Sequence, residues 1–230
     1  MKKQSLPNST FRLLFLLFIP FSILVPVSRA THTMGADLTY NCIGPNQYQV
    51  VLTFFRDCDG IVPTATQTVT YASASCGVSS TILLTQPNPA VDVTPLCPSQ
   101  TSACSGGTSL FGIEQYVYTG ILSLPPACGD DWELGWTNCC RNFAITSLSI
   151  PGNQSTYVPA ELDNTLSSCN NSPVFNNIPT PIVCVNQPVF YNHGVTDPDG
   201  DSLVFSLTDC YQDLGVPVVY NTGFSAVTPL

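Results

Sequence analysis

The sequence predicts an all-β, disulfide-rich protein. Short runs rich in Val, Ile, Thr, Tyr and Phe recur along the chain, separated by Gly, Pro, Asn and Asp, which is typical of strands joined by turns. Helical periodicity is nearly absent. All eleven cysteines follow an apolar leader. We expect tandem immunoglobulin-like β-sandwich modules, of which the second is incomplete.

Residues 1–30 have the features of a secretory signal peptide. A basic start precedes an apolar run over residues 13–27, and Ser28 and Ala30 place small side chains where a signal peptidase reads. An uncleaved anchor is the alternative, which the prolines in the apolar run disfavour because they interrupt a long helix. No later segment reaches about 18 uninterrupted apolar residues, so we expect no integral membrane span after cleavage.

The charge beyond residue 30 is strongly acidic. This part of the chain has two arginines, no lysine and all fifteen acidic residues. Nucleic-acid binding needs clustered basic side chains, so we exclude nucleic acid as a partner. An anionic membrane surface would repel the same charge. We expect a secreted, extracellular cell-surface location, with a surface, matrix or glycan partner that the composition does not identify.

The cysteines predict disulfide bonds, because an exported chain meets an oxidising compartment. A zinc site is disfavoured, since the sequence has no Cys-x-x-Cys pair and its two histidines lie far from any such cluster. The odd number leaves at least one thiol unpaired or paired to a segment beyond this sequence. Spacing does not fix the connectivity, although Cys97 and Cys104 are close enough in sequence to close a small loop.

The clearest predicted strand covers residues 47–55, where apolar and aromatic side chains alternate with polar ones. Turn-forming residues 44–46 join it to a strand over 38–43 as a hairpin. In a later run, Trp132, Leu134 and Trp136 alternate and are expected to face the core. Further strands are expected over 66–72, 78–84, 115–122, 132–137 and 143–150.

We place a domain boundary near residue 168, at the end of a polar stretch. Residues 31–168 are interpreted as a disulfide-rich β-sandwich domain, with a disulfide-pinned excursion over 86–107. Residues 169–230 are interpreted as a partial immunoglobulin- or cadherin-like domain, shorter than the roughly 100 residues of an immunoglobulin domain, so the chain is expected to be a fragment. Its strands are expected over 182–185, 189–191, 203–207 and 216–220.

An acidic turn is the strongest candidate metal site. Asp197, Asp199 and Asp201 alternate along a turn that precedes an apolar run, and such carboxylates can supply the oxygen ligands that Ca²⁺ prefers. The turn is not an EF-hand, because its sixth residue is Ser202 and no helix follows. The alternative is an ordinary Pro-Asp-Gly turn without metal. Repulsion among the three carboxylates favours Ca²⁺.

Arg56 and Arg141 each lie close to a cysteine in the sequence, and we interpret both arginines as structural. A planar guanidinium satisfies several carboxylate or carbonyl acceptors at once, and an anion-binding role is the alternative. The adjacent cysteines beside the second arginine are expected to point to opposite faces of a strand and bond to two different neighbours. The structural residues are Arg56, Asp57 and Cys58 in one group and Cys139, Cys140, Arg141 and Asn142 in the other.

No catalytic motif is present. We find no Gly-x-Ser-x-Gly, His-Glu-x-x-His or phosphate-binding glycine motif, and His32 and His193 are solitary. We therefore predict no enzymatic activity, with a secreted hydrolase as a distant alternative. An aromatic platform for saccharides is a second alternative, although strand alternation favours a core position for its members. Those aromatic residues are Tyr116, Tyr118, Trp132 and Trp136.

Several segments carry a resemblance to a known group of proteins, and the Cys-Cys-Arg-Asn block at 139–142 is the most specific of them. The others are residues 32–40, 55–58, 171–175, 197–203 and 220–225. The chain resembles the gliding-motility-associated, type IX-secreted multi-domain surface proteins of Bacteroidota, which contain PKD-, immunoglobulin- or cadherin-like repeats. The resemblance implies a surface role in adhesion or motility. Such proteins carry a C-terminal sorting domain, and none is visible in this sequence.

These observations predict a secreted cell-surface structural or adhesion module, stiffened by disulfides and by Ca²⁺. A carbohydrate-binding adhesin module is the main alternative.

Overall fold

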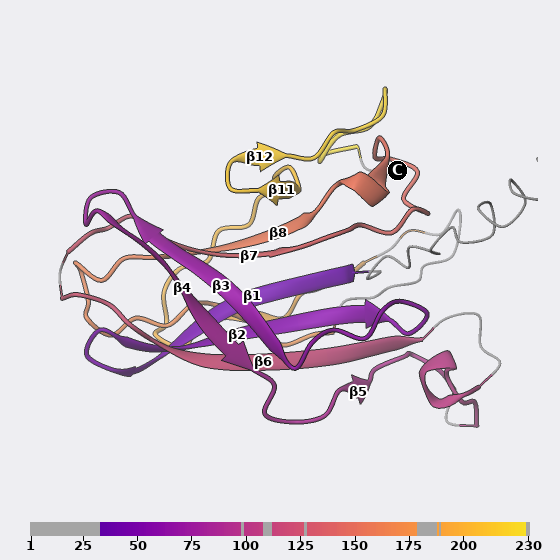
Figure 1. The fold of residues 1–230 in the computed structure, drawn as a ribbon, viewed down its shortest axis with the longest axis horizontal. Helices are drawn as coiled ribbons and strands as arrows, with labels where there is room; N and C mark the ends of the chain where they lie inside the picture. The colour runs from indigo at the N-terminus through magenta and orange to yellow at the C-terminus, as the bar shows by residue number, and fades with distance from the viewer. Residues whose placement is uncertain are drawn as a thin grey trace, which may run out of the picture.

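The computed structural model describes residues 33–97, 99–107, 112–126, 128–178, 188 and 190–228. Within them the regular structure is β-strand, with 3-10 turns at Ala103–Ser105 and Pro151–Asn153 and no α-helix (Figure 1). The all-β prediction is confirmed. No helix in the described part is long and apolar enough to cross a bilayer. The predicted signal peptide and the predicted strand at 182–185 lie outside the described residues.

Ten strands form one antiparallel sheet in the order β1-β2-β6-β4-β3-β7-β8-β11-β12, with β5 paired to β6 beside this path. Two further strands, β9 and β10, pair with each other. The strands are β1 (Thr33–Gly44), β2 (Gln47–Asp57), β3 (Thr66–Ser73), β4 (Val78–Thr85), β5 (Val91–Asp92), β6 (Ile113–Ser123), β7 (Trp132–Asn138), β8 (Thr156–Leu162), β9 (Val174–Phe175), β10 (Val195–Thr196), β11 (Tyr211–Asp213) and β12 (Val216–Pro217).

The sheet curls so that its first strand returns to β7 and β8. Figure 1 shows β7 and β8 running above β1 and β2, and β1 contacts both of them. The Tyr40 hydroxyl on β1 donates to the carbonyl of Glu161 on β8 at 2.9 Å. The core fills the space between these two layers. The tandem immunoglobulin-like arrangement remains a prediction.

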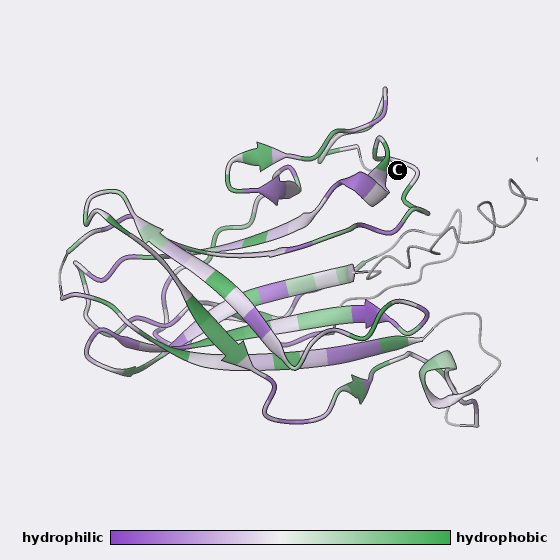
Figure 2. Ribbon diagram, in the orientation of Figure 1, coloured by the Kyte–Doolittle hydropathy of each residue, from purple (hydrophilic) through white to green (hydrophobic). Residues whose placement is uncertain are grey.

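The core follows the alternation that the sequence predicts, and Figure 2 shows hydrophobic and hydrophilic residues succeeding one another along the strands. Trp132 and Trp136 are each 1% exposed. The indole N–H of Trp132 donates to Asn164 Oδ1 at 3.2 Å, and that of Trp136 donates to Gln67 Oε1 at 3.1 Å. Because both rings are buried and satisfied, the tryptophans are core residues and form no saccharide platform.

The β1–β2 hairpin is confirmed, and its turn is tied to the far end of β8. Asn46 adopts a φ of 56°, a left-handed conformation that asparagine tolerates. Its side-chain oxygen accepts from Asn164 Nδ2 at 3.0 Å, and its backbone N–H donates to the Ser168 carbonyl at 2.7 Å. The turn therefore anchors the segment that follows β8.

Disulfides join distant parts of the chain, as the sequence predicts, but the suggested connectivity is corrected in two places. Cys104 bonds to Cys58 while Cys97 is exposed and free, so a Cys97–Cys104 pair is wrong. Cys139 and Cys140 bond to each other, so the prediction that they bond to two different neighbours is also wrong. Cys210 is exposed and free. The pairs are Cys42–Cys169, Cys58–Cys104, Cys76–Cys128 and Cys139–Cys140.

The strands predicted at 143–150 and 203–207 are absent, and residues 190 and 191 of the strand predicted at 189–191 are also unpaired, while residue 189 lies outside the described residues. Residues 143–150 form turns, in which Asn142 Oδ1 accepts the N–H of Ala144 at 2.9 Å and thereby competes with strand pairing. Residues 203–207 are not paired to another strand, and Val204 is 92% exposed. Conversely, β8 forms within a polar stretch for which the sequence predicts no strand.

Segments after the predicted boundary at residue 168 pack against strands before it. Tyr211 on β11 pairs with Tyr157 on β8. The Gln154 side chain donates to the Val219 carbonyl at 3.1 Å and accepts its N–H at 2.7 Å. Ser172 exchanges hydrogen bonds with Tyr40 on β1. These contacts attach the end of the chain to both edges of the curled sheet.

Candidate binding groove on the outer face of the sheet

The outer face of β1, β2 and β6 forms the floor of a groove. Alternation turns the core residues inward and leaves a second set on the opposite face. The register sets Asp37 opposite Thr53, and Phe55 between Gly35 and Gln115. These five residues line one cavity of about 300 Å³.

The wall of the groove comes from the β9–β10 pair and the residues beside it. Phe175 ends β9, and the residues after it continue along the groove. Tyr191 and His193 precede β10 and line the same cavity. The wall residues are Phe175, Asn176, Asn177, Ile178, Tyr191 and His193.

Hydrogen bonds within the wall hold its two segments together. Asn177 Nδ2 donates to the Asn192 carbonyl at 2.7 Å, and the Tyr191 hydroxyl donates to the Asn177 carbonyl at 3.1 Å. Asn176 Nδ2 donates to the Thr196 hydroxyl at 3.0 Å. The wall is therefore preorganised, which lowers the entropic cost of binding a ligand.

Aromatic rings gather on this wall. The His193 ring lies 4.7 Å from the Tyr191 ring and 5.8 Å from the Phe175 ring, edge to face in both cases. Phe175 is 47% exposed, whereas Phe55 on the floor is 8% exposed. A ligand in the groove would contact the buried ring beneath it and the exposed rings at its side.

A larger pocket of about 590 Å³ adjoins the groove and shares Gly35, Phe55 and Ile178 with it. Its other described lining residues are mostly apolar. They are Thr33, Met34, Val93, Pro95, Ile113, Asn142, Ala144 and Ile145.

Asp37 is the titratable floor residue of the groove. Burial raises the pKa of its carboxyl from 3.8 to about 6. No hydrogen bond or ion pair reaches this carboxylate from the described residues. A desolvated carboxylate without a partner costs folding free energy, and such residues concentrate at functional sites.

We predict that Asp37→Asn stabilises the protein at pH 7 by on the order of 2 kcal/mol. Because the folded pKa of Asp37 is raised, its unfavourable contribution is absent below about pH 3.8, grows toward pH 6 and is complete above it. Asp131 acts oppositely, since hydrogen bonds from Ser73 and Ser75 lower its pKa to about 2, so its contribution is lost only in strong acid.

Urea unfolding from pH 4 to pH 8 measures this effect. The variant is expected to lose the decline in stability between pH 4 and pH 6 that the unaltered protein shows. Asp59→Asn, which changes an exposed carboxyl outside the groove, is the matched control. Parallel stability curves for unaltered protein and Asp37→Asn would contradict the burial argument.

The acidic turn uses two of its carboxylates in hydrogen bonds. Asp197 Oδ1 accepts the N–H groups of Asp199 and Asp201 at 2.8 and 3.2 Å. The Asp199 carboxylate accepts the backbone N–H and side-chain amide of Asn171 at 2.7 to 3.1 Å. Asn171 in turn accepts the N–H of Cys42 at 2.8 Å, which connects the turn to β1. Ca²⁺ binding here remains a prediction.

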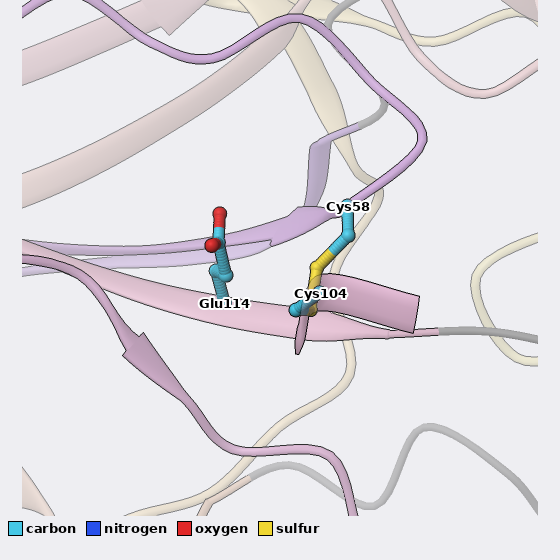
Figure 3. A group of neighbouring side chains, drawn as sticks. All are labelled: Cys58, Cys104 and Glu114. Atoms are coloured by element: carbon cyan, nitrogen blue, oxygen red, sulfur yellow. A yellow bond between two sulfur atoms is a disulfide. The ribbon is translucent and has the colours of Figure 1, made fainter. Parts of the chain in front are cut away.

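One group of three metal-ligating residue types converges within 4.8 Å in the described part of the chain, namely Cys58, Cys104 and Glu114 (Figure 3). Its two sulfurs are bonded to each other, and a disulfide offers no thiolate to a metal. Glu114 already pairs with Arg56. This group is therefore a covalent and ionic brace and not a calcium site.

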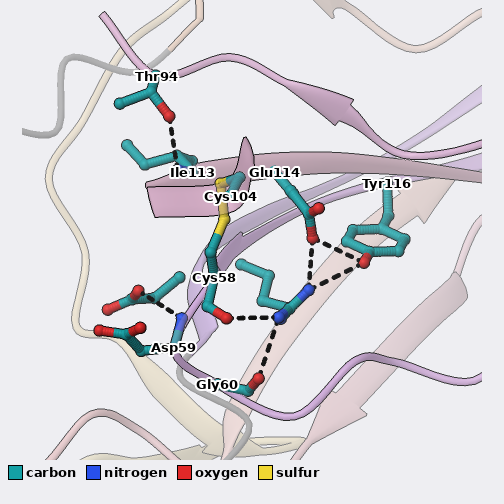
Figure 4. Close-up of polar contacts among 10 residues, drawn as sticks. Cys58, Asp59, Gly60, Thr94, Cys104, Ile113, Glu114 and Tyr116 are labelled. Carbon is teal, nitrogen blue, oxygen red and sulfur yellow. Dashed lines mark hydrogen bonds and ion pairs between the residues drawn. A yellow bond between two sulfur atoms is a disulfide. The ribbon is translucent and has the colours of Figure 1, made fainter. Parts of the chain in front are cut away.

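Arg56 is buried and holds the end of β2 in place. Its guanidinium pairs with Glu114 and donates to the Tyr116 hydroxyl at 3.0 Å (Figure 4). It also donates to the carbonyls of Cys58 and Gly60 at 2.7 and 3.0 Å. Asp57 Oδ1 accepts the N–H of Asp59 at 3.1 Å in the same turn.

Arg141 holds the chain end against β8. Its Nε donates to the Ser155 carbonyl and its Nη2 to the Tyr211 carbonyl, each at 3.0 Å. Burial lowers the pKa of this guanidinium. Its neighbours Cys139 and Cys140 form the adjacent-residue disulfide, and Asn142 lines the larger pocket.

Comparison with protein-family models, curated proteins and solved structures finds no match for this chain.

The groove was not apparent from the sequence. In the sequence, Asp37 is part of a segment that carries the resemblance, and His193 is a solitary histidine. The one available signal was that Asp37 is a polar residue in the alternating pattern of β1. The wall residues that complete the groove lie far along the chain and reach Asp37 only in the folded protein.

Proposed function

We propose that the protein is an exported structural or adhesion module of the cell surface, built from immunoglobulin-like β-units. The observation that carries this proposal is the Cys42–Cys169 bond, which joins residues 127 positions apart. Disulfides persist in oxidising compartments. This bond also shortens the covalent path through the domain, which suits a module that transmits force between a surface and its partner. The resemblance to gliding-associated surface proteins adds attachment during motility to the proposal.

Surface location and attachment test this function together. Protease added to intact cells should cleave the protein, and deletion of its gene should reduce attachment to surfaces. Complementation with the unaltered gene should restore attachment. A variant lacking residues 1–30 should not, because it is not exported. A protein confined to the cytoplasm, or attachment that is unchanged by deletion, would refute the proposal.

Calcium binding by Asp197, Asp199 and Asp201 belongs to the same proposal. Three carboxylates in one turn form an oxygen-rich site, and a bound cation would relieve their repulsion. Titration calorimetry with Ca²⁺ should give saturable heat that Asp199→Asn/Asp201→Asn abolishes. Asp59→Asn/Asp130→Asn, which removes two exposed charges outside the turn, is the charge-matched control. Equal heats from the unaltered protein and the double variant would remove calcium from the account.

Glycan binding is the second candidate function. Its site would be the groove, because the tryptophans are buried in the core. The rings of Phe175 and Tyr191 and the amide of Gln115 offer stacking and hydrogen-bonding groups in one cavity. A glycan array probed with the unaltered protein and with Phe175→Ala tests this alternative. A saccharide that binds in the groove should give a signal with the unaltered protein that the variant loses.

A further inference from the structure

Asp37 places an uncompensated negative charge on the floor of the groove. In the described part of the chain the two arginines have other partners: Arg56 pairs with Glu114, and Arg141 donates to two backbone carbonyls. Beyond residue 30 the sequence contains no lysine. Among the described residues, therefore, no lysine reaches Asp37, and both arginines have other partners. A partly desolvated charge is more stable when it is paired, so a cationic ligand would be favoured beside Asp37.

The rings around Asp37 suit an organic cation. Phe55 lies on the floor, and Phe175 and Tyr191 lie on the wall of the same cavity. Aromatic faces attract ammonium groups, and the attraction increases when water is excluded. The rings also provide apolar contact for the carbon stem that carries such a group.

We propose that this groove binds a protonated alkylamine, the chemistry of a lysine side chain, presented by a partner protein. Asp37 pairs with the ammonium group, and the rings of Phe55, Phe175 and Tyr191 contact the methylene stem. The inference deepens the adhesion function and rests on it.

The occupant is a lysine from another protein for three reasons. A second copy of this chain beyond residue 30 has no lysine to offer. The acidic surface attracts basic partners over a distance. The adjoining apolar pocket of about 590 Å³ leaves room for residues that flank the lysine. A neutral saccharide would use the rings and amides but leave the Asp37 charge unpaired.

Calorimetry with three probes tests the inference: acetyl-Gly-Lys-Gly-amide, the same peptide with an acetylated lysine, and N,N′-diacetylchitobiose as a neutral saccharide. The lysine peptide should bind, and acetylation should weaken binding on the order of tenfold or more. Asp37→Asn should weaken it similarly. This variant is expected to fold more stably, so its loss of binding would not reflect unfolding. Asp59→Asn should leave affinity unchanged.

NMR provides a readout that a purely structural role would not change. Binding of the lysine peptide should shift the titration of the Asp37 carboxyl to lower pH, because an adjacent cation favours the ionised form. The other titratable side chains lining the groove, Tyr191 and His193, are followed in the same spectra. Asp59→Asn, at an exposed carboxyl outside the groove, should retain the Asp37 shift.

The outcomes separate this inference from the proposed function. Equal binding of the lysine and acetyl-lysine peptides, or binding of N,N′-diacetylchitobiose alone, would overturn the amine site. Lack of binding together with surface attachment that depends on the protein would overturn the site and leave the proposed function standing. Lysine binding that needs Asp37 would support the site even if gene deletion left attachment unchanged.

Discussion

Replacing Trp136 with alanine is expected to destabilise the protein by about 3–5 kcal/mol, the cost typical of truncating a large buried aromatic side chain. Its ring is 1% exposed and lies 5.4 Å from the Phe54 ring across the core. The change would also leave Gln67 Oε1 without the indole N–H that it accepts. Urea unfolding of the oxidised protein measures the loss.

Phe205→Ala is the matched control, because Phe205 is 67% exposed and its truncation should change stability by less than about 0.5 kcal/mol. If Trp136→Ala left stability unchanged and instead removed binding of a saccharide, Trp136 would be a surface platform. That result would contradict the core described above.

The strand alternation of the first hairpin could be predicted because it is local. Tyr48 and Phe54 fall on one face of β2 whatever lies opposite, and the Gly-Pro-Asn turn fixes the connection to β1. The burial of Trp132 and Trp136 follows from the same period-two pattern.

Features that depend on distant partners could not be predicted. Residues 203–207 are rich in strand-forming residues, but a segment forms a strand only where the fold provides a neighbouring strand to pair with. Cys104 is nearer in sequence to Cys97, yet the fold brings it to Cys58 at the end of β2.

The groove has the same origin. Asp37 is an ordinary outward-facing residue of β1 until the β9–β10 pair places Phe175, Tyr191 and His193 beside it. Burial raises the pKa of Asp37, and no local sequence pattern encodes that burial.

Force spectroscopy gives the most direct test that disulfides make this domain a load-bearing scaffold. The Cys42–Cys169 bond encloses the Cys58–Cys104 and Cys76–Cys128 pairs, so tension applied at residues 33 and 228 should bypass the enclosed chain. A reducing agent should release the 127-residue span. At about 3.5 Å per extended residue, this adds on the order of 400 Å of contour length.

Cys76→Ser/Cys128→Ser is the matched control, because removing an enclosed pair should not change the extension of the oxidised protein. The account predicts a short extension for the unaltered oxidised protein and for this variant, and a long extension for both after reduction. An oxidised protein that extends as far as the reduced one would contradict it.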